Sequence, residues 1–156
     1  MSASDTTSDV LFNRIAWLCS RREYCSRGVL DLLRRKGVTD EDAAAVLERL
    51  RSERYVDDAR YARAFARDKA HLAGWGPRKI SYVLASKGIP ADVVRAALAE
   101  VEEGESARRM REVIQVKWRS VKAVTPFERR QKVLRFALSR GYDFEAVTEV
   151  LDSLEE

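Results

Sequence analysis

Residues 32–50 read LLRRKGVTDEDAAAVLERL, and this stretch predicts two helices joined at a glycine. The apolar residues after the glycine are spaced at 0, +3, +4 and +7, the spacing of one helix face, and they are Ala43, Val46, Leu47 and Leu50. The cationic run before Gly37 suits the carboxyl end of a helix. Gly37 is therefore expected to close that helix in the left-handed conformation.

The same pattern occurs three times. The spacing returns at residues 94–101, VRAALAEV, and at 147–154, VTEVLDSL, 51 and then another 53 residues along the chain. A preceding helix repeats with the same offsets, and the two are joined by RKGV, SKGI and SRGY. The glycines predicted to take the left-handed conformation are Gly37, Gly88 and Gly141.

A longer helix stands in front of each pair, so the chain is predicted to be all-α, with about nine helices. Helix starts are indicated at Asp57 or Asp58, and at Thr125-Pro126-Phe127-Glu128, which fits a capping box. The predicted architecture is an elongated tandem array of three three-helix repeats. Its parts are a flexible N-terminal tail at residues 1–8 and repeats at 9–54, 55–103 and 104–156.

Charge alternates along the helices. Residues 21–36, 60–87 and 108–140 carry net charges of +4, +6 and +9, whereas 39–58, 92–105 and 143–156 carry −4, −4 and −6. Helix dipoles explain part of this alternation but not excesses spread over whole helices. The repeats are expected to form a basic edge suited to a phosphate backbone and an acidic edge suited to a cationic protein surface. The alternative is that the edges pair internally or are only solvated.

Catalytic, metal-binding and membrane-spanning motifs are absent from the sequence. No phosphate-binding loop or dinucleotide fingerprint is present, and His71 is the only histidine. Asp57-Asp58 could be read as paired catalytic or metal-binding carboxylates, but their position favours a helix cap. Cys19 and Cys25 are too few for a zinc site, and two free thiols are favoured over a disulfide between them. We expect a cytoplasmic protein with no enzymatic activity, cofactor, metal or membrane span.

Residues 55–89, YVDDARYARAFARDKAHLAGWGPRKISYVLASKGI, resemble the central unit of the regulatory protein RecX family. The matching positions are Tyr55, Asp57, Asp58, Phe65, Ala66, Trp75, Gly76, Pro77, Arg78, Ile80, Leu84, Lys87, Gly88 and Ile89. The first repeat resembles the family's opening at Leu18, Arg22, Tyr24 and Ser26, and the third matches more loosely through VLRFALSRGYDFEAV. Val83 and His71 depart from the family's usual residues at their positions.

The resemblance implies a modulator of the RecA recombinase that acts in homologous recombination, DNA repair and the SOS response. Such proteins lie along the groove of the RecA filament on single-stranded DNA and mostly inhibit ATP hydrolysis, strand exchange and co-protease activity. A monomer that binds the filament, single-stranded DNA and, weakly, duplex DNA is expected. Candidate contact residues are Arg63, Arg67, Trp75, Arg78, Lys79, Lys87, Arg129, Arg130, Lys132 and Arg135. Trp75 is either a stacking platform or a residue that pins the turn against the core, and its glycine neighbours favour the second role.

Two other functions fit the residues alone. A stand-alone DNA-binding helical module would use three-helix units as helix-turn-helix proteins do. The acidic third helix of each repeat argues against conventional reading of the major groove by that helix. A purely structural helical adaptor is the remaining alternative.

Overall fold

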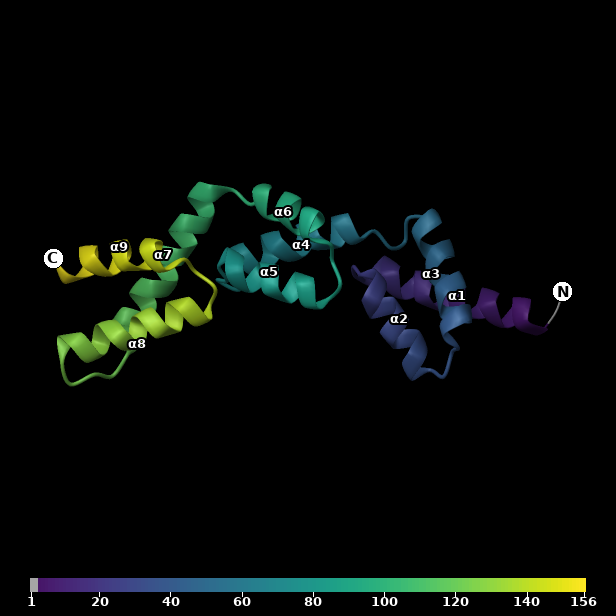
Figure 1. Ribbon diagram of the computed structural model, residues 1–156, viewed down its shortest axis with the longest axis horizontal. Coiled ribbons are helices and arrows are strands. Elements are labelled where there is room, and N and C mark those ends of the chain that lie inside the picture. Colours follow the sequence, from purple (N-terminus) through teal and green to yellow (C-terminus); the bar gives the residue numbers. More distant parts are fainter. Residues whose placement is uncertain (1–2) are drawn as a thin grey trace. The chain divides into compact units, whose positions relative to one another are not determined.

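The computed structural model describes residues 3–156, with side chains from Thr7 onward, and this part is helical without a strand (Figure 1). The result confirms the predicted all-α fold of tandem helices. The helices are α1 (Ala3–Arg21), α2 (Ser26–Arg35), α3 (Asp40–Ser52), α4 (Asp58–His71), α5 (Pro77–Ser86), α6 (Ala91–Ala99), α7 (Glu103–Ser120), α8 (Pro126–Ser139) and α9 (Phe144–Glu155).

The helices are divided between two compact units. The first comprises the described residues through Tyr61 together with Lys87–Ile89, and the second comprises Ala62–Ser86 and Pro90–Glu156. The boundary therefore falls within α4. The residue limits of the three repeats remain a prediction.

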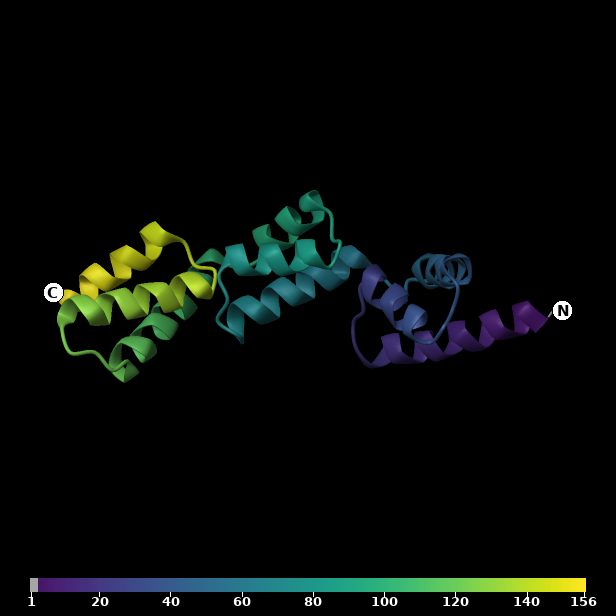
Figure 2. The ribbon, with the colours of Figure 1, turned by 60° about the horizontal axis from the view of Figure 1, so that its bottom comes forward.

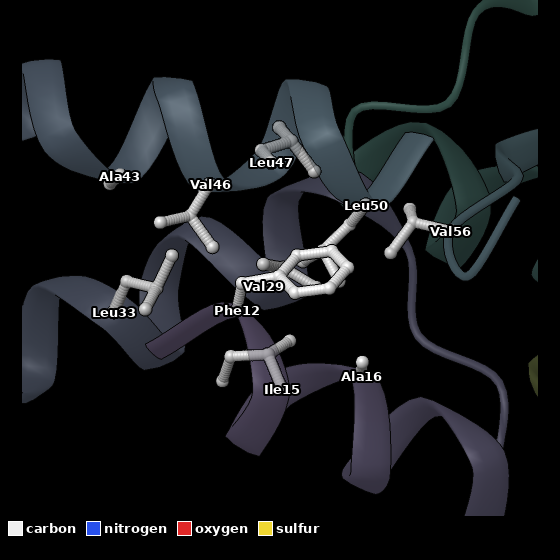
Figure 3. Packing of buried hydrophobic residues seen from close by; sticks show 10 residues of the cluster. All are labelled: Phe12, Ile15, Ala16, Val29, Leu33, Ala43, Val46, Leu47, Leu50 and Val56. Atoms are coloured by element: carbon white, nitrogen blue, oxygen red, sulfur yellow. The ribbon is translucent and has the colours of Figure 1, made fainter. Parts of the chain in front are cut away.

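The core of the first unit lies among α1, α2 and α3 (Figure 3). The helix face predicted from the spacing at 43–50 is buried as a whole. Phe12 and Ile15 of α1 pack below it, and Val56 closes one end. The ten buried residues are Phe12, Ile15, Ala16, Val29, Leu33, Ala43, Val46, Leu47, Leu50 and Val56.

Helix α1 begins earlier than the sequence indicated. A tail was expected at residues 1–8, whereas the helix begins at Ala3, and residues 1–2 lie outside the described part. Extending an existing helix fixes one residue for each hydrogen bond gained, so the polar stretch can continue a helix that the apolar residues after it stabilise. Asp9, directly after this stretch, pairs with Arg49 of α3 at 2.8 Å.

All three repeat glycines have the predicted left-handed conformation, with φ of 79° at Gly37, 79° at Gly88 and 90° at Gly141. The first and third close their helices with the double hydrogen bond of a Schellman motif. The N–H groups of Gly37 and Val38 donate to Arg34 and Leu33 at 2.9 and 3.1 Å, and those of Gly141 and Tyr142 donate to Leu138 and Ala137 at 3.0 and 3.3 Å.

The two adjacent aspartates at the start of α4 cap different helices. Asp57 accepts the N–H of Arg60 at 3.0 Å and is the N-cap of α4, as predicted. Asp58 accepts the N–H of Ser26 at 2.7 Å, which is the first residue of α2. The Cys25 side chain makes no capping hydrogen bond, so Asp58 supplies from 32 residues away the cap that α2 lacks locally.

We expect Asp58→Ala to destabilise the first unit by about 1–2 kcal/mol, the usual cost of a lost helix cap. Urea denaturation followed by circular dichroism measures the change. Asp58→Asn keeps an oxygen acceptor and should recover most of the loss. An Asp58→Ala protein with unchanged stability would show that the 2.7 Å contact does not stabilise α2.

The second unit contains α5–α9 and most of α4. In both ribbon views α8 runs beside α9, and α7 packs against both (Figures 1 and 2). The Thr125 hydroxyl accepts the N–H of Glu128 at 3.1 Å with Pro126 in the first helical turn, which confirms the predicted start of α8. The buried cluster of these three helices is Met110, Ile114, Val133, Ala137, Tyr142, Val147, Val150 and Leu151.

Two glycines bring the α4–α5 turn into backbone contact with the α8–α9 turn. The Gly76 N–H donates to the Arg140 carbonyl at 2.7 Å, and the Arg78 N–H donates to the Gly141 carbonyl at 3.1 Å. A Cβ at Gly76 would lie 2.3 Å from the Gly141 carbonyl, and one at Gly141 would lie 2.4 Å from the Lys79 nitrogen. Only glycine fits at either position, because real Cβ atoms do not approach other atoms so closely.

Two arginines reinforce the same junction. Arg140 donates to the Ala73 carbonyl at 2.9 Å, and Arg109 of α7 donates to the His71 and Leu72 carbonyls at 3.1 and 3.3 Å. These carbonyls belong to the last residue of α4 and to the two residues after it, where cations are favourable. The junction therefore combines backbone pairing with charged caps.

Candidate nucleic-acid interface

A basic cleft lies between α7 and α8 of the second unit. It has a volume of about 410 Å³ and is lined by Lys117, Val121, Lys132, Arg135, Phe136 and Ser139. Four of these residues lie on α8 with the spacing of one helix face: Lys132, Arg135, Phe136 and Ser139. Val133 and Ala137 are buried in the core, so the face with these four residues is turned outward. The charged residues that line the cleft are all cations, namely Lys117, Lys132 and Arg135. We call this site the α7–α8 cleft.

Phe136 gives the α7–α8 cleft an aromatic surface between cations. The Lys117 Nζ lies 4.8 Å from its ring centroid, and the Arg140 Cζ lies 5.0 Å from it. Cations at these distances are attracted to the face of the ring. An aromatic ring flanked by cations is suited to a nucleotide, because the ring stacks on a base while the cations meet phosphate.

Lys132 is held in place by its neighbours. Its Nζ donates to the Lys122 carbonyl at 2.8 Å and pairs with Glu128 at 2.9 Å. The hydrogen bond from Lys132, and then that from the Val124 N–H, lower the pKa of the Glu128 carboxyl below its ordinary value. Arg135 has no recorded partner among the described residues and is exposed.

We expect the Glu128 carboxyl to titrate below the usual range of glutamate in carbon-13 NMR spectra. Because its folded-state pKa is lowered, its stabilising effect is present above the unfolded-state pKa and is lost as the pH falls through the folded-state value. Lys132→Gln should move the titration midpoint upward, whereas Arg135→Gln should leave it in place. A titration midpoint of Glu128 that stays the same in Lys132→Gln would contradict the contact between these two side chains.

A second group of cations surrounds Trp75. The Lys69 and Lys79 Nζ atoms lie 4.7 and 4.3 Å from the Trp75 ring centroid. Phe65 meets the ring edge-on, with the centroids 6.0 Å apart. Trp75 is half-buried. Its contact with Phe65 fits the predicted packing role, and its use as a stacking platform remains a prediction.

Four other candidate cations lie outside the α7–α8 cleft. Arg63 pairs with Glu100 at 3.7 Å, and Arg78 pairs with Asp143 at 3.4 Å while its side chain stays 72% exposed. Arg67 has a 66% exposed side chain beside Asp68. Lys87 belongs to the first unit and is half-buried.

Two candidate arginines are used inside the third repeat. Arg129 donates to the Trp118 carbonyl at 2.9 Å, and its guanidinium lies 4.2 Å from the centre of the Trp118 ring. Arg130 pairs with Asp152 and Glu155 of α9, at 2.9 Å each, and its side chain is only 23% exposed. Both side chains are therefore engaged within the third repeat.

The ion pairs of Arg130 with α9 show that some charges of a basic helix are neutralised by the acidic helix of the same repeat. Arg34–Asp40 and Arg78–Asp143 are further pairs across a helix junction, at 3.0 and 3.4 Å. Exposed pairs of this kind contribute little stability each. The α7–α8 cleft differs from these places because Lys117 and Arg135 face no recorded carboxylate among the described residues.

Sequence reasoning missed Lys117, Arg109 and Arg140. Lys117 belongs to the basic segment 108–140, but no motif marks it apart from the other cations there. Arg109 and Arg140 were counted only as charge, because the carbonyl groups that they cap come from a turn 38 and 67 residues away.

The described residues hold no cluster of three or more histidine, cysteine or acidic side chains suited to a metal ion. None of the helices in the described part has the length and hydropathy needed to cross a membrane. Cys19 and Cys25 are both free thiols, and burial raises the pKa of Cys19.

The tandem helices and the α7–α8 cleft define a class of protein: a tandem helical-repeat protein with a basic cleft. Models of the RecX family match the chain twice, as its second three-helix domain at residues 57–98 and its third at residues 103–151. A protein named Regulatory protein RecX in Prosthecochloris aestuarii is 32% identical over 154 residues, covering 99% of this chain and 98% of its own length. The chain belongs to the RecX family.

Another relative of that name, in Geobacillus thermodenitrificans, is 32% identical over 144 residues, which are 90% of this chain. The alignment spans about half of that longer relative, 52% of its length. The crystal structure of a regulatory protein RecX has a TM-score of 0.86 at 20% identity and covers 96% of this chain and 74% of its own. RecX from Lactobacillus salivarius has a TM-score of 0.79 at 16% identity, with 95% and 96% covered. These two structures support the fold.

Proposed function

We propose that this chain regulates RecA by binding the RecA filament on single-stranded DNA. The observation that carries the proposal is the α7–α8 cleft, with three cations around a phenylalanine, in a member of the RecX family. Its expected effect is inhibition of ATP hydrolysis, strand exchange and co-protease activity in the cytoplasm, during recombination, DNA repair and the SOS response. Binding without catalysis is sufficient for this role.

In this proposal the cations of the second unit face the DNA backbone. Lys117, Lys132 and Arg135 form the main phosphate contact, and Lys69, Trp75 and Lys79 form a second one. Acidic side chains of α9 without an ion pair among the described residues, such as Glu145 and Glu149, face cationic patches on RecA. Several weak contacts within one chain add up to a useful affinity, so a monomer is sufficient.

Fluorescence anisotropy with labelled single-stranded DNA tests the proposal. The labelled strand is presented bare, as a duplex, and coated with RecA and a slowly hydrolysed ATP analogue. We expect binding to be tightest on the RecA-coated strand, together with a fall in RecA ATPase rate. Equal affinity for bare DNA would favour the alternative of a stand-alone DNA-binding module, and no binding to any of the three would favour a structural adaptor.

A further inference from the structure

The second unit contains another cleft, of opposite character to the α7–α8 cleft. It lies at the junction of α4–α6 with α7 and the start of α9, has a volume of about 410 Å³, and is lined mainly by apolar side chains. They include Ala70, Ile80, Leu98, Ala107, Met110 and Ala146. We call it the junction cleft. Its volume lies within the range of about 300–1,000 Å³ that is common for ligand sites.

The lining of the junction cleft combines rigid and adaptable parts. Ile80 and Met110 are buried, while Leu98 and Ala107 are half-buried. Trp75 forms part of the wall with one edge against Phe65. Methionine fills irregular gaps and adjusts to different partners, so the cleft can accept an inserted apolar side chain without a large rearrangement.

The charged residues among those lining the junction cleft are two carboxylates, Glu103 and Asp143. Asp143 is balanced by Arg78 at 3.4 Å. Glu103 is exposed in the first turn of α7 and has no recorded ion-pair partner among the described residues. A phosphate group is disfavoured beside Glu103, whereas a lysine or arginine is favoured there.

Tyr142 supplies an additional polar group. It lines the junction cleft, is 97% buried, and its hydroxyl has no hydrogen-bond partner in the described part of the chain. Burial raises its pKa, so the hydroxyl stays protonated and remains a donor. A buried donor without an acceptor is costly, and a peptide carbonyl that reached it would remove that cost.

We infer that the junction cleft is a docking site for a segment of another protein that carries a large apolar side chain next to a lysine or arginine. The apolar side chain fills the space between Ile80 and Met110, and the cation pairs with Glu103. This contact is separate from the α7–α8 cleft and shares only Trp75 with the second phosphate contact of the proposed function. It does not depend on that function, because its cation pairs with Glu103.

The probe for this site is the peptide acetyl-Lys-Phe-Lys-amide, titrated into the full chain and followed by nitrogen-15 NMR. We expect saturable shifts of backbone amides that line the junction cleft, such as those of Ala70 and Leu98. Acetyl-Lys-Ala-Lys-amide should give no saturable shift there, because it lacks the apolar anchor. Acetyl-Glu-Phe-Glu-amide should bind about fivefold or more weakly, because its charges are repelled by Glu103.

Variants of the chain locate the site. Ala107→Leu should fill the cleft and lower the affinity for the Lys-Phe-Lys peptide about tenfold or more. Burial of one large apolar side chain changes an affinity by at least that factor. Ala99→Leu narrows the cleft from an exposed position and should act in the same direction without disturbing the core. Glu103→Lys should weaken binding of the peptide severalfold. Glu102 is an exposed neighbour outside the lining, so Glu102→Lys should leave peptide binding unchanged.

Three results would overturn the inference. The first is a Lys-Phe-Lys peptide that shifts no amide of the junction cleft. The second is equal binding of the Lys-Phe-Lys and Glu-Phe-Glu peptides, or equal effects of Glu103→Lys and Glu102→Lys. The third is a concentration-dependent dimer, seen by sedimentation and abolished by Ala99→Leu, because a second copy of the chain would then be the occupant. Filament binding can succeed or fail independently of all three.

Discussion

Replacing Gly141 by alanine is expected to destabilise the second unit by about 3 kcal/mol or more. The new Cβ would lie 2.4 Å from the Lys79 nitrogen, so the α4–α5 turn has to move away from the α8–α9 turn. Alanine is also disfavoured at a φ of 90°, which adds about 1–2 kcal/mol to the cost of overpacking. Urea denaturation followed by the fluorescence of Trp75 and Trp118, both in this unit, measures the loss.

Two other glycines provide matched controls for this change. Gly37 closes its helix in the same way with a φ of 79°, but a Cβ there meets nothing within 4 Å, so Gly37→Ala should cost only about 1–2 kcal/mol. Gly104 lies in α7 with open space around it, and Gly104→Ala should be neutral or stabilising. If Gly37→Ala and Gly141→Ala lost the same stability, the backbone contact between the α4–α5 and α8–α9 turns would contribute nothing to it.

Neutralising the α7–α8 cleft is expected to have the largest effect on binding. In a triple variant, Lys117→Gln, Lys132→Gln and Arg135→Gln, three phosphate contacts are lost together. For single-stranded DNA the slope of log K against log salt should become shallower by about 2, since each contact contributes about 0.7. Affinity for the RecA-coated strand at low salt should fall about tenfold or more. Anisotropy titrations over a range of salt concentrations measure both quantities.

The control for this experiment carries the same change of charge elsewhere in the second unit. Arg95, Arg111 and Arg119 are exposed, have no recorded partner among the described residues, and do not line the α7–α8 cleft. Replacing these three by glutamine should leave the salt slope closer to that of the unaltered chain. If both triple variants lose the same affinity, binding depends on net charge alone and the cleft is not a site.

Much of the fold follows from local rules that the sequence displays. The 0, +3, +4, +7 spacing identified the buried face of α3 because one face of a helix against a core is a local property. The left-handed conformation of Gly37, Gly88 and Gly141 was predictable for the same reason, since a helix end followed by glycine has few alternatives. The start of α1 was misplaced because polar residues at a helix end give no periodic signal.

The candidate site was less predictable because it depends on distant partners. Sequence alone gave Arg129 and Arg130 the same weight as Lys132 and Arg135, since all four stand in one basic helix. The structure distinguishes them: Arg130 reaches two carboxylates of α9, whereas Arg135 opens onto the α7–α8 cleft. Asp58 was placed correctly at a helix start, but the helix that it caps is α2, 32 residues earlier.

The contact between Gly76 and Gly141 has a consequence for how this protein can change during evolution. Two of its hydrogen bonds join main-chain atoms, so they require room for the backbone rather than any particular neighbouring side chain. Positions around the two glycines, apart from the arginines that cap the same junction, can therefore be substituted while the turns keep their geometry. A joint of this kind allows the surfaces on either side to acquire new partners without a new fold.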